Sequence, residues 1–221
     1  MGNAIGKRYR RVINAAANGG NLIQDADAAI RRGKDCLNQG KYSQALDLFL
    51  EAVQLNPDNA DSYYYMGVVF AGSGKHAEAI ACFTEAIKRS PGNTLILAKR
   101  GAAYCSVGQY KHAIEDLNET IRIDPGGEGG YAYFVRAFAC LELGQHKRAI
   151  EDATKSLLFR CSEGAYVCRA VANLNLGQYE QAVEDSNEAL RLDPDNKNVQ
   201  RCRETALFLL KQQQGTDATA G

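Results

Sequence analysis

The sequence predicts an all-α protein, a solenoid of antiparallel helix pairs, and three observations lead to this prediction. First, the pattern Gly-Lys/Gln-Tyr/His, followed three residues later by Ala, recurs five times at intervals of 34, 34, 36 and 33 residues. Second, apolar residues between these points follow helical spacing. Third, all four prolines lie twelve residues after one of the alanines. A fixed period in this range is typical of chains whose repeats stack on their neighbours. The five alanines are Ala45, Ala79, Ala113, Ala149 and Ala182.

Each repeat is expected to contain two helices, helix A and helix B. The glycine of the pattern ends helix A in a tight turn, and proline prevents helix B from continuing. Small residues seven positions before the turn glycine let the two helices approach closely; they are Gly33, Gly67, Gly101, Ala137 and Ala170. The predicted repeats are 26–59, 60–93, 94–129, 130–162 and 163–196. Gly126–Gly130 inserts two residues before the fourth repeat, and Cys161 replaces its proline.

The ends of the chain differ from the repeats. Residues 1–25 form a basic arm. Residues 197–213 have apolar side chains at helical spacing, which predicts a helix that caps the last repeat. Residues 214–221 are small and polar, so a disordered tail is expected.

The second repeat shows best which family the chain resembles. Its small, aromatic, turn and proline positions are occupied by Gly67, Phe70, Gly74, His76, Ala79, Phe83, Ala86 and Pro91. This pattern resembles the tetratricopeptide repeat, and the resemblance covers about residues 26–196. It implies a right-handed superhelix of five helix pairs that binds protein or peptide partners in a concave groove.

The resemblance also indicates which helix-A residues face that groove. They are Arg31, Lys34, Tyr64, Tyr65, Val68, Lys99, Tyr131, Phe134, Val135 and Phe138. We expect a groove that is apolar and aromatic through its centre, with cations near its N-terminal end, and such a surface indicates a partner. The alternative is that some of these side chains pack on neighbouring helices. Ile30, Tyr65 and Leu95 occupy places where members that clamp the carboxylate of a heat-shock chaperone need polar groups, which disfavours a co-chaperone.

Charged residues within the repeats also follow the period. Arg100, Arg136 and Arg169 are followed sixteen residues later by Asp116, Asp152 and Asp185. In the second repeat both positions are uncharged. This correlation predicts ion pairs between helix A and helix B of one repeat. A row of arginines that binds a ligand remains the alternative.

Composition limits the possible functions. The chain has 26 basic and 26 acidic residues, and no basic stripe follows the repeats, so a nucleic-acid partner is not expected. The seven cysteines form no C-x-x-C pair, which favours reduced thiols in a cytoplasmic protein over disulfides or zinc. No catalytic set, phosphate loop or metal motif is present. We therefore expect no enzyme activity, cofactor, metal or small-molecule substrate. There is no transmembrane run and no hydrophobic signal peptide.

The N-terminal arm, which begins Met1-Gly2-Asn3-Ala4-Ile5-Gly6, resembles an N-myristoylation signal at Gly2, although Gly6 replaces the usual Ser or Thr. One acyl chain gives marginal binding, so a second signal is needed for stable anchoring. Basic residues supply it by attraction to an anionic leaflet; they are Lys7, Arg8, Arg10 and Arg11. Two interpretations stay open: membrane association on the cytoplasmic face, or a basic helix that caps the first repeat.

Together these features predict a non-catalytic scaffold or adaptor that binds a peptide or helix in the groove. A structural subunit that uses repeat edges or the convex face is the main alternative.

Overall fold

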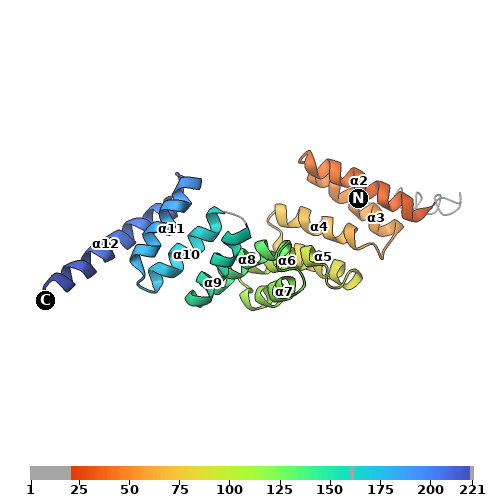
Figure 1. Cartoon of the computed structure of the whole chain (residues 1–221). Coiled ribbons are helices and arrows are strands. Elements are labelled where there is room, and N and C mark those ends of the chain that lie inside the picture. The colour runs from red at the N-terminus through yellow and green to blue at the C-terminus, as the bar shows by residue number, and fades with distance from the viewer. Residues whose placement is uncertain (1–20, 160–161, 220–221) are drawn as a thin grey trace. The chain divides into compact units, whose positions relative to one another are not determined.

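The computed structural model describes residues 21–159 and 162–219, and all regular secondary structure in these ranges is α-helical (Figure 1). The chain divides into two compact units, Met1–Val107 and Gly108–Gly221. In the first unit the helices are α2 (Leu22–Asn38), α3 (Tyr42–Leu55), α4 (Ala60–Gly72), α5 (His76–Arg89) and α6 (Thr94–Ser106). In the second unit they are α7 (Tyr110–Ile123), α8 (Glu128–Glu142), α9 (His146–Phe159), α10 (Glu163–Asn175), α11 (Tyr179–Leu192) and α12 (Lys197–Thr219).

The predicted all-α helical repeat fold is confirmed, and the chain forms two compact units. The boundary between them falls in the turn of the third repeat, between α6 and α7. In a repeat protein each repeat contacts only its neighbours, so no single core has to hold the whole chain together.

In the first unit, α2 packs on α3 and α4 on α5, while α3 contacts α4 and α5 contacts α6. Their helix A segments begin at asparagine caps. The side chains of Asn21, Asn59 and Asn93 accept hydrogen bonds from the backbone N–H groups of the third residues after them. Helix α2 therefore starts at Leu22, four residues before the predicted beginning of the first repeat.

The turn between the two helices of each repeat needs glycine. All five turn glycines have φ between 69° and 75°, a conformation that other residues rarely adopt. They are Gly40, Gly74, Gly108, Gly144 and Gly177.

Helix A and helix B approach closely because the residues that meet at their contact, sixteen positions apart in the sequence, are matched in size. A Cβ atom on Gly33 would lie 2.5 Å from the Phe49 ring, and one on Gly67 would lie 2.6 Å from the Phe83 ring. Where helix A has Ala137 or Ala170 instead, the residue sixteen positions later is smaller. It is Ala153 or Ser186, and all four are essentially inaccessible to solvent. A larger residue on one helix is thus matched by a smaller one on the other.

In the second unit, α8 packs on α9 and α10 on α11, and α12 covers α11 as the expected cap. Two boundaries differ from the prediction. Helix α8 begins at Glu128, because the Asp124 carboxylate accepts hydrogen bonds from the N–H groups of Gly127 and Glu128. Part of the glycine-rich insertion is thereby wound into α8. The chain also stays helical to Thr219 rather than becoming disordered after Gln213, because no proline stops the helix.

None of the helices that the structure describes is both long enough and apolar enough to cross a bilayer.

Candidate functional site

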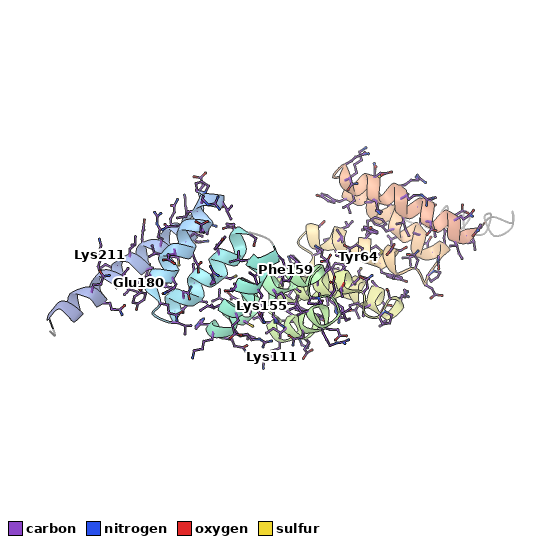
Figure 2. All side chains as sticks on the ribbon, in the orientation of Figure 1. Tyr64, Lys111, Lys155, Phe159, Glu180 and Lys211 are labelled. Atoms are coloured by element: carbon purple, nitrogen blue, oxygen red, sulfur yellow. The ribbon has the colours of Figure 1, made fainter. Side chains whose placement is uncertain are left out.

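Two aromatic side chains of α4 lie at the helix-A surface of the first unit. The Tyr65 ring stacks on Phe49 with 5.4 Å between centroids, and Tyr64 meets Tyr65 edge-on at 4.9 Å. The Lys34 Nζ atom lies 5.2 Å from the Tyr65 ring centroid, in a cation–π contact. Both tyrosines are half-buried, so they support the core and still present part of their surface. Tyr64 is labelled in Figure 2.

The remaining predicted groove residues of the first unit differ in accessibility. Arg31 is exposed and Lys99 is half-buried, while Val68 packs against the core around Phe83. The helix-A side chains of this unit therefore combine cations with aromatic surface. Ile30 is buried.

In the second unit, α8 presents an aromatic face that consists of Tyr131, Phe134 and Phe138. Tyr131 and Phe138 are each 37% exposed. The rings of Tyr131 and Phe134 lie 6.4 Å apart, and Phe138 meets the Tyr110 ring at 6.3 Å. These positions are three and four residues apart, so they share one side of the helix.

The prediction of Val135 as a groove residue is wrong. Its side chain is 5% exposed, and Ala132 and Ala139, which share its side of α8, are fully buried. Val135 therefore belongs to the core of the second unit.

Next to the aromatic face lies a cavity of about 530 Å³, here called the Gly164 cavity. Its lining comes from the start of α8, from α9 and from the start of α10: Gly130, Tyr131, Phe134, Ser156, Ser162, Glu163 and Gly164. Its volume falls within the range of about 300–1,000 Å³ that is typical of ligand sites. Sequence reasoning had missed five of these lining residues: Gly130, Ser156, Ser162, Glu163 and Gly164. The one signal was Gly164 itself, at a helix-A position where the other repeats have side chains.

In the second unit, Arg136 and Arg169 each form an ion pair with an aspartate. Arg136 binds Asp152 through two hydrogen bonds of 2.7 Å, from Nε to Oδ2 and from Nη2 to Oδ1. Arg169 binds Asp185 in the same way at 2.9 and 2.6 Å, and Asn173 donates to the same carboxylate. Burial acts to lower the pKa of Arg136, but the hydrogen bonds and charge of Asp152 raise it above its ordinary value.

These arginines also bind helix B of the preceding repeat, which the sequence did not reveal. The Arg136 Nη1 atom donates to Asn118 Oδ1 at 2.6 Å, and Arg169 Nη1 donates to Thr154 Oγ1 at 3.1 Å. In the first unit, Arg100 donates to Thr84 in the same manner at 3.1 Å. Each arginine thus connects two successive repeats. Arg100 and Asp116 belong to different units, and their pairing stays a prediction.

The side chains of Arg136 and Arg169 are too little exposed to solvent to form a row that binds a ligand. Only 12% of the Arg136 side chain and 25% of the Arg169 side chain are exposed. We therefore assign both arginines to the architecture of the repeats.

The thiols of Cys105, Cys140 and Cys168 are buried. Burial and, to a smaller extent, the charges of Glu142 and Glu163 raise the pKa of Cys168 to about 12. The lipidation residue Gly2 and the basic residues Lys7, Arg8, Arg10 and Arg11 lie outside the described residues.

Comparisons with solved structures show the same fold. MamA from Desulfovibrio magneticus RS-1 is 20% identical with a TM-score of 0.69, over 78% of this chain and 97% of that chain. A tetratricopeptide repeat protein from Parabacteroides merdae is 21% identical with a TM-score of 0.70, over 88% and 77%. YrrB, described as having an unusual peptide-binding site, is 19% identical with a TM-score of 0.68, over 90% and 97%.

A search of curated protein sequences found no match. Two family models described as tetratricopeptide repeats match the sequence, one at residues 30–94 in the first unit and one at residues 164–196 in the second. The periodic turns, the paired helices and these matches agree, and the chain is a tetratricopeptide repeat protein.

Proposed function

We propose that the chain is a non-catalytic scaffold that binds a peptide or helix of a partner protein through its helix-A surface. The observation that carries this proposal is the aromatic face of α8, where Tyr131 and Phe138 are exposed beside the Gly164 cavity. Aromatic side chains in such places supply much of the free energy of protein–protein binding. The peptide-binding site described for YrrB, which has the same fold, agrees with this use.

The test is selection of a random peptide library on the full chain, followed by affinity measurement with the selected peptides. A Tyr131→Ala/Phe138→Ala variant should bind them at least about 30-fold more weakly, because loss of a hot spot costs about 2 kcal/mol or more. The matched control is Tyr42→Ala, which removes a similarly exposed aromatic ring from the helix-B surface. Unchanged affinity in a folded double variant would contradict the proposal. Tyr65→Ala is a poorer probe, because that ring stacks on the core residue Phe49.

The alternative, a structural subunit of a larger assembly, is favoured by the end of α9. Leu158 is 81% exposed and Phe159 is 50% exposed. At the position of Leu158 the other repeats have polar residues, namely Gln54, Lys88, Arg122 and Arg191. An assembly through this end should dissociate in Leu158→Arg, measured by sedimentation velocity. A wild type that stays monomeric at high concentration would exclude self-assembly through it.

Anchoring at a membrane through a myristoyl group on Gly2 is part of the proposed function. It is supported by the sequence of the arm, where four basic residues follow within eleven positions and no acid does. Gly2→Ala should abolish membrane association in cell fractionation, and high salt should weaken it in the wild type. Intact-mass measurement that finds an unmodified N-terminus, with no protein in the membrane fraction, would contradict anchoring.

A further inference from the structure

Two of the helix-A positions that line the Gly164 cavity are glycines, Gly130 and Gly164. At the place of Gly164 the other repeats have Asp27, Asp61, Leu95 and Tyr131. A Cβ atom on Gly164 would lie 2.7 Å from Phe134 Cε2, so glycine lets this ring lie close against α10. A Cβ atom on Gly130 would lie 2.9 Å from Phe159 Cβ. The hollow is therefore built into the packing of α8, α9 and α10.

The polar groups of the lining divide into two kinds. Both serine hydroxyls serve the protein itself, because Ser156 Oγ donates to the carbonyl of Gly130 at 3.0 Å and Ser162 Oγ accepts from the N–H of Ala165 at 3.2 Å. Glu163 is different, since it brings a full negative charge to the lining. The Asn196 side chain donates to its Oε1 atom at 2.7 Å and so holds the carboxylate in place.

The charge of the lining favours a cation. Among the residues that the structure describes, the lining has one acid and no base, together with two aromatic rings. The positive end of the α10 dipole would favour an anion, but Glu163 lies in the first turn of that helix and offsets it.

The combination of a ring and a cation recurs within the protein. The Arg89 guanidinium lies 4.0 Å from the Tyr63 ring centroid, and Lys155 Nζ lies 5.5 Å from the Tyr133 centroid. An ammonium or guanidinium group between an aromatic ring and a carboxylate gains from both contacts.

We propose that the Gly164 cavity takes the side chain of a lysine or arginine from the bound peptide. The aliphatic part of that side chain lies against Tyr131 and Phe134, and its charged end faces Glu163. This inference rests on the proposed function, because it names the residue type that a peptide on the helix-A surface places in the cavity.

The experiment uses the same random peptide library, selected in parallel on the full chain and on two variants. Glu163→Gln removes the charge but keeps an oxygen that can accept the hydrogen bond from Asn196. Glu180→Gln is the matched control, since Glu180 is an exposed glutamate on α11 that does not line the cavity (Figure 2). The best peptide is then resynthesised with norleucine in place of its enriched lysine, or with citrulline in place of arginine, and its affinity is measured by fluorescence polarisation.

We expect peptides selected on the wild type and on Glu180→Gln to share one position with lysine or arginine. The uncharged analogue should bind the wild type at least about tenfold more weakly. For Glu163→Gln the enrichment should disappear, and the charged and uncharged peptides should bind about equally.

The outcomes separate this inference from the proposed function. Enriched peptides without a basic position, or an undiminished basic preference in Glu163→Gln, would overturn the inference and leave peptide binding intact. Selection of acidic or phosphorylated residues at that position would overturn it in favour of the helix dipole. If no peptide is enriched on a folded wild type, the proposed function fails, and the inference fails with it.

Discussion

Removal of the Asp152 carboxylate should destabilise the second unit strongly, because it leaves the Arg136 charge without its main partner. Asp152 is 2% exposed and the Arg136 side chain 12%. Two charge-assisted hydrogen bonds, both 2.7 Å long, join them. Each such hydrogen bond contributes about 1.5–3 kcal/mol, and the total is reduced because Arg136 is partly exposed and keeps its bond to Asn118. Asp152→Ala should therefore lower the free energy of unfolding by about 3–4 kcal/mol.

The assay is urea unfolding followed by circular dichroism, with hydrogen exchange to locate the loss of protection in α8 and α9. Local exchange is needed because repeat proteins can unfold in parts. For a chain of this size, a loss of 3 kcal/mol should lower Tm by about 6–12 °C. The double variant Arg136→Leu/Asp152→Leu should be more stable than Asp152→Ala, since it leaves no uncompensated charge.

A matched control is Glu119→Ala on α7. Glu119 pairs with Arg122 at the same 2.7 Å, but their side chains are 43% and 70% exposed. Water can replace this partner, so the change in stability should be small. If Asp152→Ala lowers the free energy of unfolding no more than Glu119→Ala does, then burial does not strengthen the contribution of the ion pair to stability, and the reasoning is wrong.

Two further predictions concern packing and pH. Gly67→Ala should cost about 1–3 kcal/mol in urea unfolding, because its Cβ would lie 2.6 Å from Phe83. Gly72→Ala on the same helix, where nothing lies within 4 Å, should be neutral or stabilising; equal effects would refute the packing argument. Cys168 has a pKa of about 12 in the folded chain against an ordinary value of 9.0, so the folded state holds more protons and stability should fall as pH rises through this window. Cys168→Ala should reduce that fall, and an identical pH dependence of unfolding would refute the assignment.

The repeat period predicted the fold well because each of its signals has a local physical cause. Glycine at Gly74 and its equivalents is required by positive φ, and the small residue at Gly67 by the Phe83 ring. The ends of helices were less predictable. Helix α2 begins where Asn21 caps it, and α8 where Asp124 does, and neither cap follows the period.

The candidate site was predictable in part. A constant offset of sixteen residues indicated the pairs of Arg136 with Asp152 and of Arg169 with Asp185, whose side chains the structure joins. Their partners in the preceding repeat vary in type and offset, so no such signal existed. Assignment by family position placed Val135 in the groove, and helical spacing agreed, because Val135 is one turn from both Tyr131 and Phe138. Only the packing in the structure shows that its side chain is buried. The cavity was invisible because it depends on missing side chains and on the three-dimensional packing around Gly164.

The use of arginines in the architecture has a consequence for binding. In the second unit, Arg136 and Arg169 lie largely beneath the surface, with their charges neutralised by Asp152 and Asp185. The charges left near the aromatic face of α8 include the carboxylate of Glu163, whose field reaches Cys168. In the first unit, by contrast, Arg31 is exposed and Lys34 lies over Tyr65. We therefore expect a peptide on the helix-A surface of the second unit to carry basic residues, and one on that of the first unit to carry acidic residues.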